Sequence, residues 1–153
     1  MFKRLIALCC VLALFACNYD APITSAPTHK IDKRLIGSWS LANTGEKTEH
    51  LTVRPYDDSN YVVWYDGDLF RAFHSDVAGM PLMSVQNLND SERKYVYVAW
   101  QVSDDGQRLT LKAVSTDVIP TTVKDSAAIE KLFEANRDKP KLFGDSAVYT
   151  RDR

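Results

Sequence analysis

The chain of 153 residues is close to neutral, with 19 Lys and Arg against 20 Asp and Glu, and 45% of its residues are hydrophobic. This length is enough for one compact domain with its own core. The balance of charge and the lack of a basic run argue against nucleic acid as a partner. All three cysteines lie within the first 17 residues. The remainder therefore offers neither a disulfide framework nor a cysteine metal site.

The first sixteen residues, 1–16, have the composition of a secretory signal peptide. The basic pair Lys3-Arg4 precedes an apolar run of 11 residues from Leu5 to Phe15, and the small residue Ala16 follows. Such a run spans about 16 Å as a helix, which is too short for a hydrocarbon core of about 30 Å. We expect a cleaved signal peptide rather than a permanent transmembrane helix.

The residues around Cys17 resemble the lipobox of bacterial lipoproteins. Leu14 and Ala16 match that motif, and Phe15 stands where the motif prefers a small residue. The resemblance implies acyl chains such as palmitate on the sulfur and the amine of Cys17. Two or three chains anchor a protein stably, whereas one is marginal. Asn18 follows the cysteine, and by the same resemblance this implies the outer membrane, facing the periplasm. The alternative, a free thiol, is unfavourable in an oxidising compartment.

Residues 17–30 are interpreted as the lipidated cysteine and a flexible tether. The segment contains Pro22 and Pro27 and few apolar residues. Thirteen residues extend to at most about 45 Å and average nearer 20 Å when flexible. We expect this tether, including a solvated His29, to hold a single folded domain over residues 31–153 away from the lipid headgroups.

From Gly37 onward the chain alternates apolar and polar residues in short runs, as half-buried strands do. Asp66-Gly67 separates two such runs and predicts a tight hairpin. Asp104-Asp105-Gly106 predicts a second hairpin, between residues 95–102 and a strand that begins at Leu109. About seven strands are expected by residue 116, at the spacing of a sandwich or barrel.

One helix is expected after these strands. Asp125 or Ser126 can cap it, and Ile129, Leu132 and Phe133 form a stripe at the spacing i, i+3, i+4. We expect the stripe to pack against the outside of the sheet, with a partner-binding face as the less favoured interpretation.

A final short strand is expected at residues 147–150. Pairing of this strand with the first one would remove the free edges of the sheet. The predicted fold class is mainly β: a small antiparallel up-and-down barrel of about eight strands, with one helix before the last strand.

Gly37-Ser38-Trp39, near the start of the first strand, resembles the Gly-x-Trp signature of lipocalins. Those proteins have an up-and-down barrel followed by a helix and a short last strand. The resemblance covers most of the chain from residue 35 as topology and three residues as motif, and the disulfide of many lipocalins is missing. It implies that Trp39 plugs the closed end of the barrel and that a late basic residue, for which Arg151 is the nearest candidate, stacks on it. The chain looks most similar to the lipocalin-like domains of bacterial lipoproteins.

The sequence offers no constellation that indicates catalysis or metal binding. His29 and His50 are not spaced as a helical ligand pair with each other or with any other histidine. His74-Ser75-Asp76 contains the residue types of a hydrolase, but adjacent residues of a strand point to opposite faces. Turn formation explains the acidic pairs Asp57-Asp58 and Asp104-Asp105 better than calcium does. We expect no enzyme, no cofactor and no metal.

Aromatic residues give the strongest indication of a binding site. Six of them fall within residues 56–73, and further ones lie at residues 95–100. Aromatic side chains on both faces of a strand exceed the need of one core face. We expect Trp64, Phe73 and Tyr97 to line an apolar pocket inside the barrel, with plain core packing as the alternative.

Two functions follow from these observations. The first is a lipid-anchored, non-catalytic envelope binding protein that holds a small hydrophobic or amphipathic ligand. The second is an interaction module that assists an assembly or inhibits an enzyme, and it predicts a filled barrel with an exposed apolar patch. A hydrolase around His74 is a third and weaker hypothesis. An eight-stranded barrel leaves room for at most one small ligand.

Overall fold

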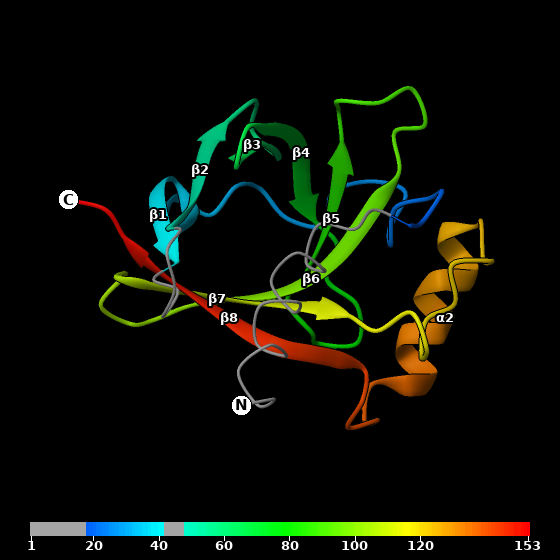
Figure 1. Cartoon of the computed structure of the whole chain (residues 1–153). Coiled ribbons are helices and arrows are strands. Elements are labelled where there is room, and N and C mark those ends of the chain that lie inside the picture. The colour runs from blue at the N-terminus through cyan, green and yellow to red at the C-terminus, as the bar shows by residue number, and fades with distance from the viewer. Residues whose placement is uncertain (1–17, 42–47) are drawn as a thin grey trace, which may run out of the picture.

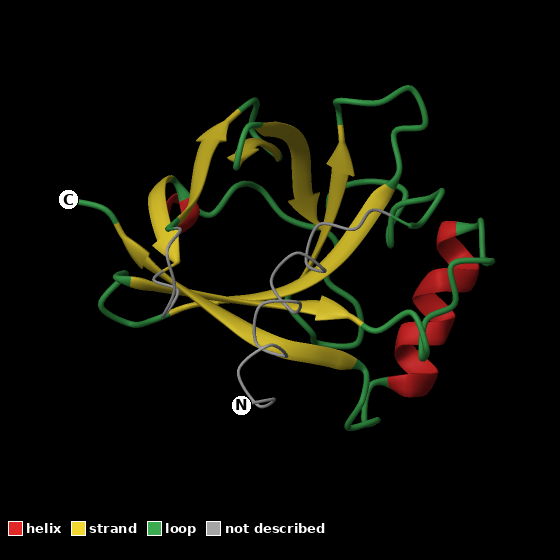
Figure 2. Cartoon of the chain, in the orientation of Figure 1, coloured by secondary structure: helices red, strands yellow, loops and turns green. Residues whose placement is uncertain are grey.

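The structure is a computed structural model that describes residues 18–41 and 48–153. Eight antiparallel strands form one closed barrel, in which each strand pairs with its neighbours along the chain and β8 pairs with β1 (Figure 1). The strands are β1 (Gly37–Leu41), β2 (Glu49–Pro55), β3 (Asn60–Tyr65), β4 (Asp68–His74), β5 (Leu82–Asn87), β6 (Tyr95–Val102), β7 (Arg108–Val114) and β8 (Phe143–Arg151). The 3-10 helix η3 (Lys33–Leu35) precedes β1, and the helix α2 (Ser126–Asn136) lies between β7 and β8 (Figure 2). The predicted fold class is therefore confirmed.

The two predicted hairpin turns are formed. Tyr65 pairs with Asp68 across the turn Asp66-Gly67, and both turn residues have positive φ, 47° and 95°. Asp-Gly tolerates this geometry, and its twist matches that of the flanking strands. Gly106, with φ of 70°, lies in the turn between β6 and β7.

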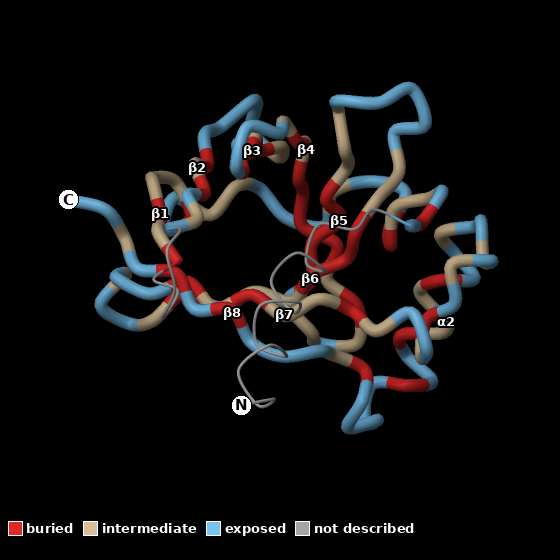
Figure 3. Tube along the Cα trace, viewed as in Figure 1, coloured by how far each residue is buried: buried red, intermediate tan, exposed pale blue. Residues whose placement is uncertain are grey.

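The alternation of side chains gives the barrel an inner and an outer apolar cluster. In β6, Val96 and Val98 belong to the inner cluster, whereas Tyr97 belongs to the outer one. Successive side chains of a strand point to opposite faces, so a single strand can serve both clusters. Buried residues accordingly follow the strands, while most turns are exposed (Figure 3).

Helix α2 covers part of the outer cluster, as its apolar stripe predicts. The Asp125 carboxylate caps the helix by accepting hydrogen bonds from the amides of Ala127 and Ala128, at 2.7 and 3.2 Å. Ile129 and Phe133 are fully buried against the barrel, and the Phe133 ring lies 6.0 Å from that of Tyr97. The helix therefore packs on the outside of the sheet.

The segment expected to be a flexible tether packs on the barrel instead, which corrects that prediction for residues 18–30. We call residues 18–32 the strap. Tyr19 and Ile23 have 2% and 0% of their surface exposed and join the outer cluster. The Tyr19 ring stacks on that of Tyr97, with 3.9 Å between centroids and 19° between planes. Tyr19 and Ile23 can dock the strap because Leu82 of β5 and Tyr97 of β6 supply apolar surface on the outer face.

Hydrogen bonds fix the strap along its length. Tyr19 forms a bridge with Tyr95 in which the two backbone amides donate to each other's carbonyls at 3.1 and 2.8 Å. The Tyr97 hydroxyl donates to the Ala21 carbonyl at 2.6 Å, and the Ile23 amide donates to Ser84 Oγ at 2.9 Å. The polar groups of an extended segment buried against a sheet need such partners.

We expect Ile23→Ala to lower the free energy of unfolding by about 2 kcal/mol or more, because it empties a fully buried site. Ser25→Ala, at an exposed position of the same strap, is the matched control and should leave it unchanged. Urea unfolding measures both. Equal stability of the two variants would restore the flexible-tether interpretation.

Candidate functional site

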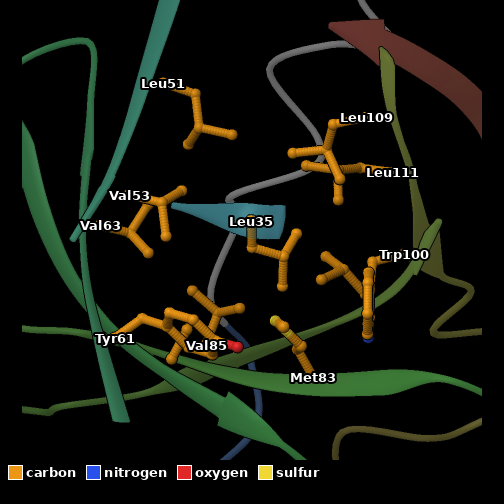
Figure 4. Close-up of a pocket in the computed structure, with 12 residues that line it drawn as sticks. Leu35, Leu51, Val53, Tyr61, Val63, Met83, Val85, Trp100, Leu109 and Leu111 are labelled. Atoms are coloured by element: carbon orange, nitrogen blue, oxygen red, sulfur yellow. The ribbon is translucent and has the colours of Figure 1, made fainter. Parts of the chain in front are cut away.

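The interior of the barrel contains a cavity of about 50 Å³. Its wall is formed by η3 and by strands β2 to β7, with side chains from Leu35, Leu51, Val53, Tyr61, Val63, Ala72, Met83, Val85, Val98, Trp100, Leu109 and Leu111 (Figure 4). Only two of these side chains carry a nitrogen or oxygen atom. A cavity with such a wall is expected to be dry and to favour an apolar occupant.

The surface of the cavity is wholly apolar, and neither the Tyr61 oxygen nor the Trp100 nitrogen is exposed to it, although both residues lie in the wall (Figure 4). Trp100 Nε1 is buried and has no hydrogen-bond partner among the described residues. A buried donor without an acceptor is costly, but an occupant of the cavity would reach this one only after side chains of the wall move.

The three residues expected to line a pocket all lie on the outer face, and this part of the site prediction is wrong. Trp64 is 54% exposed. Phe73 is buried on the same outer face as Arg71, whose guanidinium carbon lies 5.3 Å from the ring centroid. Tyr97 belongs to the outer cluster beneath the strap and α2. The lining side chains occupy the alternate positions of the same strands, Val63, Ala72 and Val98 among them.

The choice of Trp64, Phe73 and Tyr97 followed the size of their side chains. The alternation of faces along each strand would have identified the residues that line the cavity. In β6 the face that includes Val96, Val98 and Trp100 is uniformly apolar, and the face with Tyr97 also carries Gln101. The more uniform face is the inner one because the interior of a closed barrel lacks water. Trp100 is a lining residue that this signal would have found.

Trp39 and Arg151 form a clamp at the seam where β1 meets β8. The Arg151 guanidinium carbon lies 4.1 Å from the Trp39 ring centroid, which is the contact that the lipocalin resemblance implies. Trp39 is fully buried, and its Nε1 donates to the Leu35 carbonyl at 3.0 Å. Arg151 donates to the carbonyls of Gly106 and Ile36, each at 2.8 Å, and to that of Arg34. The clamp joins η3, the β6–β7 turn and the seam at one end of the barrel.

Gly37 leaves the space that the clamp requires. A Cβ at this position would lie 2.5 Å from Arg151 Nη1, and the φ of Gly37 is 146°. A side chain here would be strained and would also displace the guanidinium. In this chain the Gly-x-Trp motif therefore has two structural reasons. Arg151 approaches Gly37 closely, and the ring of Trp39 is buried.

A buried hydrogen-bond chain links the strap to the end of β4. The Asp32 amide donates to the Tyr61 hydroxyl, which lies 2.7 Å from His74 Nε2. The Tyr61 hydroxyl can both donate and accept, so the direction of its hydrogen bond with Nε2 follows the tautomer of His74. Nδ1 is buried and has no partner among the described residues. Burial lowers the pKa of His74, which the Asp76 carboxylate partly opposes, and burial raises the pKa of Tyr61 to about 12.

The geometry gives His74-Ser75-Asp76 a structural role. Ser75 Oγ and Ser84 Oγ lie 2.8 Å apart, and Thr24 Oγ1 donates to Ser75 at 2.8 Å, so this serine secures the strap. Asp76 pairs with His29 at 3.0 Å. His74 bonds to Tyr61 and not to Ser75, and the side chains are not arranged as a nucleophile and base.

A shallow groove of about 460 Å³ lies on the outer surface of β3 and β4. It is lined by Tyr56, Asp57, Asn60, Val62, Arg71 and Leu88. Tyr56 is 69% exposed, and Trp64 follows Val62 on the same face of β3. Exposed aromatic side chains next to a groove are typical of protein-contact surfaces.

Within residues 18–41 and 48–153, no three His, Cys, Asp or Glu side chains are grouped so that they could hold a metal ion. In the same ranges, no helix combines the length and the apolar character that crossing a bilayer requires.

No family model, curated protein or solved structure matches this chain. The fold defines its class as a closed, eight-stranded antiparallel β-barrel, which is compatible with a lipocalin-like fold.

We expect Arg151→Met to lower the free energy of unfolding by about 3 kcal/mol, because three carbonyl groups lose a charged donor. Arg151→Lys is the matched control. A lysine keeps the charge but cannot span three acceptors, so at least half of the loss should remain. Urea unfolding measures both, and a lysine variant as stable as the parent would show that charge alone is required.

We expect stability to fall as the pH drops below about 6.5, because the unfolded chain then takes up a proton that folded His74 resists. The slope should reach at most about 1.4 kcal/mol per pH unit and end at the lowered pKa of the folded state. His74→Gln keeps an acceptor for Tyr61 and removes the titration. Urea unfolding from pH 7.5 to pH 5 should therefore give a shallower slope for this variant, and an identical slope would exclude His74 as the cause.

Proposed function

We propose that this protein is a lipid-anchored, non-catalytic envelope binding protein with a lipocalin-like barrel that holds a small hydrophobic or amphipathic ligand. The observation that carries the proposal is the apolar cavity of about 50 Å³ at the centre of a closed barrel. The clamp between Trp39 and Arg151 supports the lipocalin-like assignment.

The surface of the cavity favours the hydrophobic form of the proposed ligand, because it is wholly apolar. Trp100 Nε1 is buried behind this surface, and the Tyr61 hydroxyl already bonds to Asp32 and His74. An apolar wall supplies affinity, whereas polar groups orient a ligand. An amphipathic ligand would place an acceptor atom beside Trp100 only after side chains of the wall move.

The volume of the cavity restricts the size of that ligand. Pockets for drug-sized molecules occupy roughly 300–1,000 Å³, far above the about 50 Å³ present here. A larger ligand would have to displace side chains. Met83 is the adaptable member of the wall because its side chain is unbranched and flexible.

The membrane anchor is proposed from the sequence around Cys17. Acyl chains on this residue would place the barrel at the outer membrane, facing the periplasm. The membrane is thus one proposed partner, the small ligand is another, and nucleic acid is not expected.

Native mass spectrometry of the full chain, expressed with its leader in a bacterial envelope and extracted gently, tests the proposal. We expect an extra mass that leaves on mild activation. Ala72→Leu adds side-chain volume to the cavity wall, and this variant should lose the extra mass.

Trp64→Ala is the matched control, because Trp64 lies on the outer face and its loss leaves the cavity intact. Retention of the mass in Ala72→Leu together with its loss in Trp64→Ala would place binding outside the barrel. A clean mass for the parent protein would argue against a tightly held ligand.

A second candidate function is a protein interaction module. The groove on β3 and β4 and the exposed side chains of Tyr56 and Trp64 favour it. Photo-crosslinking from position 64 in intact envelopes should then give one defined partner. Crosslinking from Val148, an exposed position on β8, serves as the control and should not give that partner.

A further inference from the structure

The two ends of the barrel differ in the segments that lie across them. At the covered end, where β1 begins and β4 ends, the strap and η3 lie across the strand ends. There the Ile31 amide donates to the Asp58 carbonyl at 2.9 Å, and the Asp32 amide bonds to Tyr61. The rim end is the opposite one, where β3 turns into β4 at Asp66-Gly67 and β6 begins at Tyr95.

The strap begins at the rim end. The amides of Asn18 and Tyr19 both donate to the Tyr95 carbonyl, at 3.0 and 3.1 Å. From there the strap runs over the outer face to the covered end, where the Thr28 amide donates to the His74 carbonyl at 2.9 Å. The segment therefore spans the height of the barrel, which is about 20 Å for tilted strands of this length.

The first residues of the strap are held on several sides. The Tyr19 hydroxyl donates to the Ile119 carbonyl at 2.8 Å, in addition to the stack on Tyr97. Asp20 pairs with Lys94 at 3.3 Å and also with Lys124. The strap is thus joined to β6, to the β5–β6 turn and to the segment before α2 within its first three residues.

We propose that the rim end of the barrel faces the bilayer. The β3–β4 and β5–β6 turns would then contact the lipid surface. This inference rests on the proposed acylation of Cys17. Consecutive Cα atoms are about 3.8 Å apart, so an anchor one residue before Asn18 leaves almost no slack between the lipid and the rim.

The covalent anchor, and not surface charge, sets this orientation, because each end of the barrel has exposed charges of both signs. At the rim end, Asp90 and Arg93 are exposed in the β5–β6 turn, and at the covered end Arg54 and Asp57 are exposed. Attraction to an anionic membrane alone would therefore not distinguish the two ends.

Fluorescence quenching by lipids with a nitroxide on the headgroup tests the orientation. The full chain is expressed with its leader, and mass spectrometry establishes whether Cys17 carries acyl chains. After reconstitution into phosphatidylcholine vesicles, a thiol dye that cannot cross membranes labels Ser91→Cys in the β5–β6 turn or Asp104→Cys in the β6–β7 turn. Both positions are exposed and lie at opposite ends of the barrel.

We expect several-fold stronger quenching at position 91 than at position 104. Equal quenching, or stronger quenching at position 104, on acylated protein would overturn the orientation and leave the lipoprotein assignment standing. Absence of acyl chains on Cys17 would overturn both.

A linker variant is the control for the role of the strap. Twenty Gly and Ser residues inserted between Asn18 and Tyr19 give a flexible chain of about 25 Å root-mean-square length. The difference in quenching between the two positions should then disappear. A difference that persists would show that the barrel surface itself, and not the short connection, sets the orientation.

Discussion

The contact between the Arg151 guanidinium and the Trp39 ring is the interaction on which the rest of the structure depends. A barrel is closed only if its first and last strands meet, and within the described residues β1 and β8 pair at two positions, Trp39 with Arg151 and Ser40 with Thr150. The same guanidinium bonds to carbonyls of η3, of the residue before β1 and of the β6–β7 turn. Closure of the barrel and the cover of one of its ends are therefore coupled through one side chain.

Local patterns predicted much of this fold. The Asp66-Gly67 turn, the apolar stripe of α2 and the alternation in β6 are set by residues close in the sequence, and each is present. The strap was not predicted, because Tyr19 and Ile23 become core residues only against an outer face built from distant strands. Prolines and small polar residues around them gave the composition of a linker, and composition does not reveal a complementary surface.

The residues that line the candidate site were also not predicted correctly. Aromatic size favoured Trp64, Phe73 and Tyr97, but the side of the sheet that a residue faces is decided by its position in the alternation. The large outer side chains serve the strap, the helix and the surface, while the cavity wall consists mainly of Val and Leu. The inner cluster also contains large rings, those of Trp39, Tyr61, Tyr65, Phe70 and Tyr149. A small closed barrel has little interior volume, so these side chains nearly fill it.

If Cys17 carries the proposed lipid anchor, the strap also decides where a pulling force on that anchor would act. Tyr19 lies two residues after Cys17, and its ring is stacked directly on a barrel strand. Only Asn18 would separate an anchor at Cys17 from Tyr19, the first ring that is docked on the barrel. Tension on the anchor would fall first on the Tyr19–Tyr97 stack and the Tyr95 bridge. The strap would then detach from the barrel, beginning at the rim end, before any two barrel strands separate.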